Sequence, residues 1–558
     1  MKADRIIRGR IYPADGTGSF AEAMAIRDGK ILAVGSLEDL LPFTGGATEI
    51  EEKPGLIIPG ITEGHAHVTC ASEMVFGLAL GAADSPEEYL EKIRTFRDAH
   101  PDADYIVGSG YDNGIFDRAG PTAALMDTAV SDLPVVMIAS DHHSRWLNTA
   151  ALQKTGITDR TPDPMNGEIV RDALGRATGW LKETAQLFTR QVLPPLSPED
   201  YAKAVLFYQQ LALSNGVTSA FEPMYDCMRD YDLRAEAYRL LDQRNELHMS
   251  FSLGWSLEAD ENLPVSREKL RKTRERLSDC RKVRLNTAKF FADGVIECHT
   301  AFLREDYADT PGNRGELTFS PEVFRREVMS ALEDGFDVHI HVIGDAALDM
   351  ALDALEAGQD RAREIRGEAG FRNAVTHLQL AWPDQFSRMK ELGLVAVTNP
   401  YWHYSSPVYY QALELPYLGA PRAKAQYPMK SLVDRGIPVS QASDYPVTNP
   451  PRTMDALHLM VNRRDPKHPE NEALGPQECL SVREALDILT RNGAYQLRLE
   501  HRKGSLEPGK DADFCVLSAD PFTVPKEDLY RIEVLETWAD GILRYHRAQA
   551  SIDIPKQL

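Results

Sequence analysis

Between residues 216 and 442 the sequence alternates short apolar runs with helix-like stretches. The apolar runs lie at 216–221, 248–253, 287–291, 337–342, 373–377, 394–398 and 437–442. Runs this short, bounded by turn residues, are typical of buried strands. An eighth run, Gly55–Gly60, leads toward His65 and is interpreted as the first strand of the same set. Eight strands that alternate with helices predict an α/β fold, a (β/α)8 TIM barrel, rather than an open doubly wound sheet.

Some of the stretches between the runs carry signals of helix boundaries. Pro198–Ala212 has acidic residues in its first turn, and Pro321–Glu333 is followed by Gly335. Acidic side chains stabilise the first turn of a helix, and a glycine just past the last turn is a common helix end. Both stretches are therefore predicted to be helices.

The two ends of the sequence differ from the middle, because short strand-like runs and tight turns follow one another there without helix-like stretches. The runs lie at 23–27, 30–34, 512–517 and 534–543. Asp28-Gly29 separates the first two runs, a pattern typical of a β-hairpin. Because strand-like runs flank the alternating middle on both sides, we expect the two ends to build one small β domain together.

These patterns predict how the chain divides into domains. Residues 1–58 with 500–550 form the small β domain, and residues 59–499 form the barrel. The stretch 70–215 is too long for one strand-to-helix connection, so it is predicted to be a subdomain inserted after the first barrel strand. Ser551–Leu558 is expected to be a loose tail.

Composition excludes several classes of function. The net charge is −22 and we find no clustered Lys/Arg face, so nucleic acid and anionic membranes are not expected partners. The six cysteines are scattered without a CxxC pair, which argues against a disulfide framework and a zinc ribbon. The N-terminus lacks the apolar core of a signal peptide, and no window approaches a membrane span. A cytoplasmic protein is the expectation.

Residues that can carry chemistry follow several of the predicted strands. In a barrel of this kind such residues sit at the carboxyl ends of the strands. Those ends supply His65, His67, Lys289, His341, His377 and Asp444. Side chains alternate faces along a strand, so His65 and His67 are expected to project to one side. Neutral imidazoles and carboxylates suit Zn²⁺ and similar ions, so the set predicts a metal site.

Short motifs in a fixed order extend this pattern over nearly the whole chain. They are Pro59–His67, Asp141–Ser144, Asn148–Leu152, Gly167–Val170, Gly179–Leu181, Lys289–Gly294, His341–Asp345, His377–Gln379, Ser443–Pro446 and Asn492–Ala494. In this order they resemble the metal-dependent amidohydrolases, specifically the YtcJ-like group (amidohydrolase family 3). The resemblance implies a metal-bearing barrel and a small β-sandwich formed from both chain termini.

The resemblance also implies a role for each strand-end residue. His65 and His67 would hold the more buried metal, and Lys289, when carboxylated, would bridge two metals. His341 and His377 would complete the site, and Asp444 would be the general base. The implied cofactor is a divalent metal, expected to be zinc, as one or two ions.

Other interpretations of these residues stay open. The His65-Ala66-His67 pair taken alone fits two polar residues in a loop equally well. Lys289 also fits an exposed or salt-bridged lysine, and Asp444 also fits a helix N-cap or turn aspartate. His339 would face the same side of its strand as His341. We interpret it as packed or hydrogen-bonded behind the site rather than as a ligand.

Candidate substrate contacts come from outside the barrel strands. They are His143, Asp112, Trp180, His299 and Trp402, with Tyr111, Tyr401 and His403 as further wall residues. The aromatic run Tyr401–Tyr404 follows the seventh strand, so we hypothesise an aromatic or apolar substituent on the substrate.

The sequence favours a metal-dependent hydrolase. We expect it to cleave a non-peptide C–N bond, in an N-substituted amide or formamide, by attack of metal-bound hydroxide with Asp444 as base. The alternatives are a deaminase, lactonase or decarboxylase on the same barrel, and a non-catalytic binding or regulatory homologue. The expected partner is a small-molecule substrate, and a homodimer is expected from the resemblance.

Overall fold

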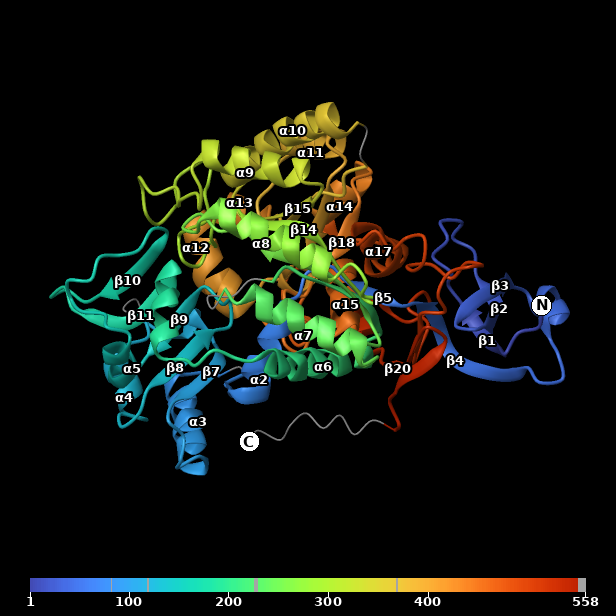
Figure 1. The fold of residues 1–558 in the computed structure, drawn as a ribbon, viewed down its shortest axis with the longest axis horizontal. Coiled ribbons are helices and arrows are strands. Elements are labelled where there is room, and N and C mark those ends of the chain that lie inside the picture. The colour runs from blue at the N-terminus through green and yellow to red at the C-terminus, as the bar shows by residue number, and fades with distance from the viewer. Residues whose placement is uncertain (82, 118–119, 225–228, 368–369, 550–558) are drawn as a thin grey trace.

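The computed structural model describes residues 1–558 except 82, 118–119, 225–228, 368–369 and 550–558. The predicted tail and Cys227 therefore lie outside the described residues. Three sheets divide the chain (Figure 1). The eight-stranded sheet is in the middle, the seven-stranded sheet is at the end that holds the N-terminus, and the six-stranded sheet is at the opposite end.

The eight-stranded sheet fits the predicted barrel. Its strands are β5 (Ile61–Glu63), β12 (Val217–Glu222), β13 (Ser250–Ser256), β14 (Val283–Phe291), β15 (Asp337–Val342), β16 (Ala374–His377), β17 (Val395–Thr398) and β18 (Val439–Gln441). Each pairs in parallel with the next. The backbone N–H of Gly64 donates to the carbonyl of Gln441 at 2.9 Å and links the last strand to the first. All seven apolar runs between 216 and 442 are strands of this barrel.

The prediction of the first barrel strand was wrong in position. Gly55–Pro59 belongs to β4 (Glu49–Pro59) of the seven-stranded sheet, and the barrel receives only the short β5. β4 pairs with a strand on each side, which buries Leu56, Ile57 and Ile58 as completely as a barrel would. An apolar run therefore shows burial but not which sheet the strand enters. Gly60 separates the two strands, and a Cβ there would lie 2.3 Å from Oγ1 of Thr218.

Helices cover the outside of the barrel (Figure 1). They are α6 (Pro198–Ser214), α7 (Tyr231–Gln243), α8 (Leu263–Arg276), α9 (Pro321–Glu333), α10 (Asp345–Arg366), α11 (Pro383–Glu391), α14 (Met429–Asp434) and α15 (Thr453–Asn462). A capping box of Ser197 and Asp200 begins α6, and Gly335 with φ of 79° follows α9. Both predicted helices are confirmed. Shorter helices are α1 (Leu37–Leu40), α12 (Leu415–Leu418), α13 (Ala420–Lys424), α16 (Val482–Asp487) and α17 (Gly493–Gln496).

Strands from both ends of the chain share the seven-stranded sheet. In order across the sheet they are β21 (Ile542–His546), β20 (Val534–Ala539), β19 (Phe514–Leu517), β4, β1 (Arg5–Ile11), β2 (Ala21–Arg27) and β3 (Lys30–Gly35). Asp28 and Gly29 both have positive φ, 49° and 74°, as a two-residue hairpin turn requires. The predicted union of the two chain ends is therefore observed, whereas its finer description as a β-sandwich stays a prediction.

A six-stranded sheet lies between the first and second barrel strands in sequence. Its strands are β6 (Leu78–Ala79), β7 (Ile106–Tyr111), β8 (Val135–Ala139), β9 (Ser144–Leu147), β10 (Gly167–Arg171) and β11 (Ala177–Glu183). The same region holds α2 (Ser72–Phe76), α3 (Pro86–Ala99), α4 (Ala123–Asp127) and α5 (Thr149–Lys154). It has a hydrophobic core of its own, in which Trp146 packs edge-on against Phe116 at 5.2 Å between ring centroids.

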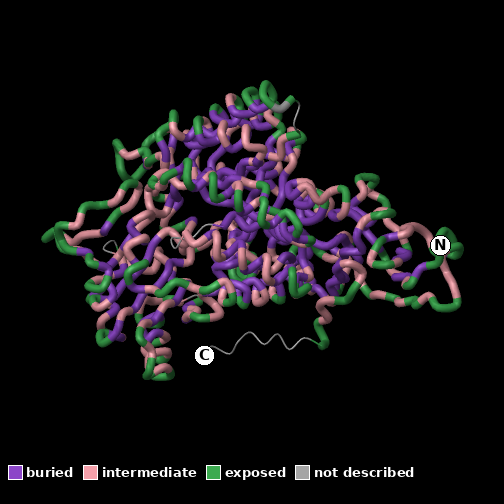
Figure 2. Tube along the Cα trace, viewed as in Figure 1, coloured by how far each residue is buried: buried purple, intermediate pink, exposed green. Residues whose placement is uncertain are grey.

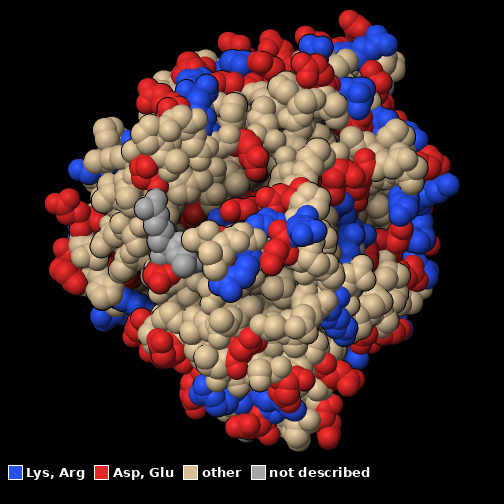
Figure 3. Space-filling model, turned by 90° about the vertical axis from the view of Figure 1, so that its left-hand side faces the viewer, with Lys and Arg blue, Asp and Glu red and all other residues tan. Residues whose placement is uncertain are grey.

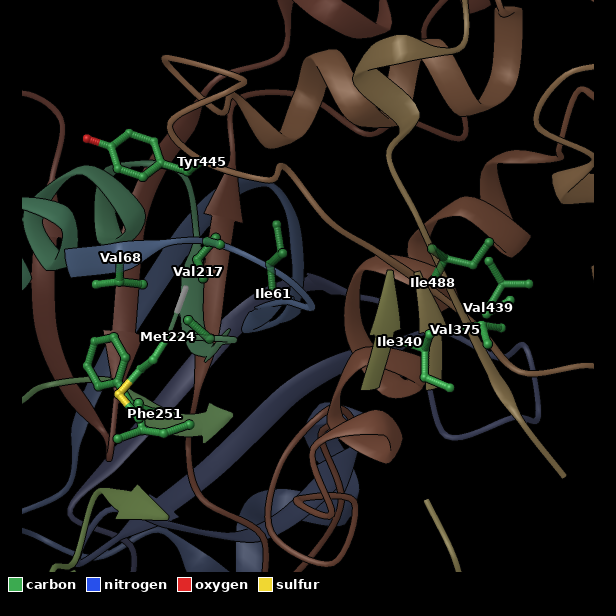
Figure 4. Close-up of a cluster of buried hydrophobic side chains, with 14 of the residues drawn as sticks. Ile61, Val68, Val217, Met224, Phe251, Ile340, Val375, Val439, Tyr445 and Ile488 are labelled. Carbon is green, nitrogen blue, oxygen red and sulfur yellow. The ribbon is translucent and has the colours of Figure 1, made fainter. Parts of the chain in front are cut away.

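Buried residues concentrate in the barrel and at its junction with the two other sheets (Figure 2). Side chains from β5, β12, β13, β15, β16 and β18 meet in one cluster, including Ile61, Val217, Phe251, Ile340 and Val439 (Figure 4). Among the residues that the structure describes, no helix is both long and apolar enough to cross a membrane.

Candidate metal centre

The predicted strand-end residues gather at one end of the barrel. Lys289 and His341 lie within β14 and β15, and His377 is the last residue of β16. His65 and Asp444 come just after β5 and β18, and the backbone N–H of Asp444 donates to the carbonyl of His65 at 2.8 Å. Because the strands are parallel, their carboxyl ends share one edge of the barrel, which brings residues far apart in sequence together.

His65, His67 and Asp444 form the tightest group. Oδ1 of Asp444 lies 3.2 Å from Nε2 of His65 and 3.2 Å from Nε2 of His67. Candidate ligand atoms of the three residues all lie within 4.8 Å of one another. Oδ1 of Asp444 is buried without a hydrogen-bond partner among the described residues, although two imidazole nitrogens lie close to it. Two imidazoles and an unsatisfied carboxylate oxygen around one point fit a divalent cation such as Zn²⁺.

The protonation states in this group suit metal binding. Burial lowers the pKa of His65 well below its usual value, so the imidazole is neutral and keeps a lone pair. Burial alone would raise the pKa of the Asp444 carboxyl, but the adjacent imidazoles of His65, His67 and His377 outweigh it and hold that pKa well below its usual range. A neutral imidazole and an ionised carboxylate are the forms that bind metals.

Lys289 is a fully buried amine of the barrel. It is 0% exposed, and its Nζ has no hydrogen-bond partner among the described residues. The nearest ring is that of Phe291, whose centroid lies 4.5 Å from Nζ. Burial lowers the pKa of the amine to about 7, although the Asp444 carboxylate opposes the shift. The alternative of an exposed or salt-bridged lysine is not what the structure shows.

His341 and His377 lie beside the group of His65, His67 and Asp444. Their ring centroids are 4.6 Å apart, and the His377 ring is 5.2 Å from that of His65. Nε2 of His341 donates to the carbonyl of Gly294 at 3.0 Å, and Nδ1 of His377 donates to Oδ1 of Asn399 at 2.9 Å. Burial lowers the pKa of His377 to about 4 and that of His341 well below its usual value. Each neutral ring thus keeps one nitrogen as an electron-pair donor.

Three residues that orient the site were given no role from the sequence. Asn399 directly follows the barrel strand β17, and Glu222 is the last residue of β12. Because chemically active residues of such a barrel lie at the carboxyl ends of its strands, both could have been found from the sequence. Glu222 accepts from the backbone N–H of Thr69 at 2.9 Å, just after His67. Glu63 accepts from the backbone N–H of His65 at 3.0 Å and that of Ser443 at 2.9 Å.

His339 also orients the site. Its Nε2 lies 2.9 Å from Nδ1 of His65, and its ring stacks on Phe221 at 4.7 Å between centroids. Contacts of this kind fix the tautomer and the orientation of a metal-binding imidazole. The structure places His339 behind His65, as the sequence interpretation expected.

The inserted subdomain contributes a charged histidine beside the barrel end. Nδ1 of His143 lies 2.9 Å from Oε2 of Glu183, and the His143 ring is 5.9 Å from that of His341. Burial alone would lower the pKa of His143, but the carboxylates of Glu183, Asp141 and Glu297 raise it to about 9. His143 is therefore an imidazolium at neutral pH.

A cavity of about 610 Å³ opens over the candidate metal centre. Of the predicted substrate contacts, Asp112, His143 and Trp402 line it, as do His341, His377 and Asp444. The Trp402 ring stacks on that of His377 at 5.3 Å and 15°. Figure 3 shows the end of the molecule nearest the inserted subdomain, where acidic and basic side chains are interspersed around a hollowed centre.

Trp180 and His299 are not among the described residues that line this cavity. His299 lies 3.0 Å from Oδ2 of Asp309 through its Nε2, and its ring packs on that of Tyr417 at 4.1 Å. Trp180 lies on β11, where Nζ of Lys182 sits 4.2 Å from its ring centroid. His403 also lies outside the lining and stacks on Tyr427. Sequence position relative to a motif does not fix which side chains reach the cavity.

Comparisons with known proteins identify the family of the chain. A family model described as the amidohydrolase family matches residues 53–545. The chain is 29% identical to Protein LONG AFTER FAR-RED 3 of Arabidopsis thaliana, covering 96% of this chain and 90% of that protein. It is 28% identical to the putative amidohydrolase YtcJ of Bacillus subtilis, with 97% and 99% covered. It is 27% identical to the N-substituted formamide deformylase of Arthrobacter pascens, with 98% and 99% covered.

Solved structures share the fold. A crystal structure of an uncharacterized metal-dependent hydrolase from Pyrococcus horikoshii OT3 matches with a TM-score of 0.72 at 23% identity. The match covers 94% of this chain and 99% of that one, so the barrel and both additional sheets lie within one matched architecture.

Proposed function

Because this chain belongs to the amidohydrolase family, we propose that it is a metal-dependent hydrolase of a C–N bond other than a peptide bond. The proposed substrate is an N-substituted amide or formamide. The observation that carries the proposal is the buried Oδ1 of Asp444, unsatisfied between two imidazoles beneath a large cavity. The full-length similarity to a formamide deformylase supports the choice of substrate class.

The proposed cofactor is Zn²⁺. His65, His67 and Asp444 would hold one ion, and Lys289, His341 and His377 stand beside them for a second. Nitrogen and oxygen ligands in this number suit zinc. When bound, such an ion polarises a carbonyl and lowers the pKa of water to near neutrality.

Asp444 and His143 perform the proton transfer and the charge stabilisation in this proposal. The Asp444 carboxylate takes a proton from the attacking water and later donates it to the leaving nitrogen. His143 keeps its imidazolium through Glu183, and its other ring nitrogen donates to the substrate carbonyl as negative charge develops on that oxygen. The stacked Trp402 and His377 rings wall the cavity beside this point and exclude water from it.

We also propose that Lys289 is carboxylated. In that reaction Nζ loses a proton and forms a bond to the carbon of CO₂, which gives a carbamate with two oxygen atoms and a negative charge. The burial of an amine without any partner supports this proposal, because an isolated buried ammonium is costly whereas a metal-binding carbamate is not. Protein exchanged into ¹³C-bicarbonate should show a carbamate carbon signal by NMR that Lys289→Met lacks. A spectrum identical to that of Lys289→Met would contradict it.

The function is tested with zinc-loaded protein and a panel of N-substituted formamides and aryl amides. We expect release of the amine together with formate or another carboxylate, and no release by Asp444→Asn. Ammonia, a hydroxy acid or CO₂ as the product would instead identify a deaminase, lactonase or decarboxylase. Binding of the panel without any turnover by fully loaded protein would favour a regulatory homologue. Light scattering of the same sample tests the predicted homodimer.

A further inference from the structure

The cavity over the metal centre is lined by more acidic groups than cationic ones. Among the described residues that line it there is no lysine or arginine. The carboxyl groups that line it are Asp112, Asp141, Glu297, Glu414 and Asp444. Asp444 belongs to the metal centre, but the other four have no place in the proposed hydrolysis. An excess of acidic groups in a closed space favours a positively charged ligand and disfavours an anionic one.

None of these four carboxyl groups forms a salt bridge with a described lysine or arginine. Glu414, 5% exposed, accepts only neutral amide donors: Nε2 of Gln379 at 2.9 Å and Nε2 of Gln426 at 3.0 Å. Arg463 lies behind this wall, but its guanidinium donates to the backbone carbonyls of Leu474, Gln426 and Tyr427 instead. The cavity wall therefore holds one buried and three half-buried acids, and the cation near two of them, the His143 imidazolium, already pairs with Glu183.

The pKa values of these groups agree with an excess of acidic groups. Burial raises the pKa of Glu297 to about 7, Asp141 adds to the shift, and the His143 imidazolium opposes it without cancelling it. Burial also raises the pKa of Glu414 to about 8, and the Glu297 carboxylate contributes to that shift, which shows that the two groups lie within electrostatic range of each other. A cation placed between them would lower both pKa values.

Aromatic rings complete this part of the wall. The cavity is lined by Tyr401, Trp402, Tyr404, Tyr409, Tyr410 and Tyr427. Tyr409, Tyr410 and Glu414 all come from one π-helical segment, Pro407–Glu414, and such segments are frequent at binding sites. Aromatic faces attract ammonium groups, most strongly where water is excluded. Apolar rings alone would suit the aromatic substituent hypothesised above, but they do not explain the buried acids.

We propose that the substrate carries a positively charged ammonium group in addition to its scissile amide, and that Glu297 and Glu414 bind it between the tyrosine rings. The scissile amide in this inference rests on the proposed function, whereas the binding of the ammonium group does not depend on it. Its predicted substrate class is N-acyl or N-formyl derivatives of diamines. Anionic amides are expected to be poor substrates, because the acidic groups of the cavity wall outnumber the His143 imidazolium and Glu183 already pairs with that imidazolium.

The test uses matched pairs of formamides. Each ω-trimethylammonioalkyl formamide, with linkers of two to six carbons, is compared with the neutral compound in which a tert-butyl group of the same shape replaces the trimethylammonium group. For at least one linker we expect kcat/KM of the cationic member to exceed that of the neutral member by about 30-fold, as for a desolvated cation beside aromatic faces and carboxylates. Equal kcat/KM for every pair would overturn the inference while leaving hydrolysis established.

Variants identify the groups responsible. In Glu297→Gln/Glu414→Gln the cationic preference should fall to about threefold or less, whereas the exposed Glu305→Gln should keep it. A preference that survives in the double variant would overturn the assignment to these two residues. Circular dichroism and unfolding midpoints establish that the variants are folded. If the double variant does not fold, the single substitutions Glu297→Gln and Glu414→Gln replace it.

A binding measurement separates this inference from the proposed chemistry. Calorimetry with pentyltrimethylammonium and the neutral tert-butyl isostere needs no turnover. Tighter binding of the cation, lost in Glu297→Gln/Glu414→Gln, supports the inference even if no formamide is hydrolysed. Absence of cation binding to zinc-loaded protein that hydrolyses neutral formamides would refute the inference alone.

Discussion

Two buried lysines in different regions of this molecule have opposite surroundings, because one has a charge partner and the other has no hydrogen-bond partner among the described residues. Lys503 lies beside the seven-stranded sheet, 3% exposed, and pairs with the equally buried Asp513. Lys289 lies in the barrel, 0% exposed, and has no hydrogen-bond partner among the described residues. Pairing is what a buried charge needs for the fold. A buried charge without a partner is unfavourable for the fold alone, so its position indicates a ligand or a modification that completes it.

Two buried carboxylates in the same two regions differ in the same way. Asp513 accepts from Lys503 and from the backbone N–H of Asp540 at 2.7 Å, whereas Oδ1 of Asp444 has only two imidazole nitrogens near it. We therefore expect substitutions near the terminal sheet to change stability and substitutions at the barrel end to change activity.

The largest effect is expected for Asp444→Asn. An amide of the same shape cannot accept a proton from water, so kcat/KM should fall by about 10³-fold or more. The measurement is kcat/KM on the best formamide, with zinc content by mass spectrometry. The matched control is Asp513→Asn, which should unfold at lower urea concentration but keep kcat/KM of the folded protein. Full activity in Asp444→Asn would remove its assignment as the base.

The second test compares Lys289→Met with Lys503→Met in metal-depleted protein. Lys503→Met leaves Asp513 buried without its charge partner and should cost about 3–5 kcal/mol of unfolding free energy. Lys289→Met removes an unpaired buried amine and should leave the unfolding free energy unchanged or raise it. Urea unfolding followed by circular dichroism measures both. Equal losses in the two variants would show that Lys289 has a structural partner after all.

A third pair of variants separates orientation of a ligand from support of a strand. Asn399→Ala removes the acceptor that fixes the tautomer of His377 and should weaken zinc binding by about 10- to 100-fold. Asn373→Ala removes a buried acceptor for the backbone N–H of Val338 and should lower stability while zinc affinity is kept. Competition with a chromogenic chelator gives the affinity. Unchanged affinity in Asn399→Ala would exclude His377 as a ligand.

The last prediction is a pH dependence of stability caused by Glu414, which forms no salt bridge with a described lysine or arginine. Burial raises the pKa of its carboxyl to about 8, whereas the unfolded chain keeps the ordinary value, so between these pH values the native state binds the extra proton. Unfolding free energy should therefore fall as the pH rises from 5 to 8 through this group, by at most about 1.4 kcal/mol for each pH unit. Glu414→Gln should remove that part of the decline, as urea titrations at each pH would measure. An identical decline in the variant would mean that another group causes it.

The barrel was predictable because its strands carry a local signal. Seven apolar runs such as 337–342 and 394–398 became strands close to where the sequence placed them. The same regularity placed His341, His377 and Asp444 at one edge. The run Gly55–Pro59 was assigned to the wrong sheet because burial on both sides occurs in β4 as well as in a barrel strand.

Residues outside the barrel strands were not predictable in this way. Trp180 and His299 were chosen by their place near motifs, yet the chain directs them away from the cavity toward Lys182 and Asp309. Glu297 and Glu414 were missed because a loop and a π-helical segment present them, and neither segment has a periodicity that indicates its inward face. The sequence likewise gave no sign that Glu183 would lie beside His143.

The sharing of one sheet by both chain ends has a consequence for synthesis of the protein. β4 needs β19 as its neighbour to cover one edge of Ile57 and Ile58, but β19 leaves the ribosome roughly 450 residues later. At typical elongation rates this interval is roughly 20 to 90 seconds. During that time the first segment has an open strand edge, which favours pairing with other nascent chains. We therefore expect the yield of folded protein to depend strongly on chaperone binding to the first 60 residues and on stepwise truncation from the C-terminus. It should depend less on the stability of the finished barrel.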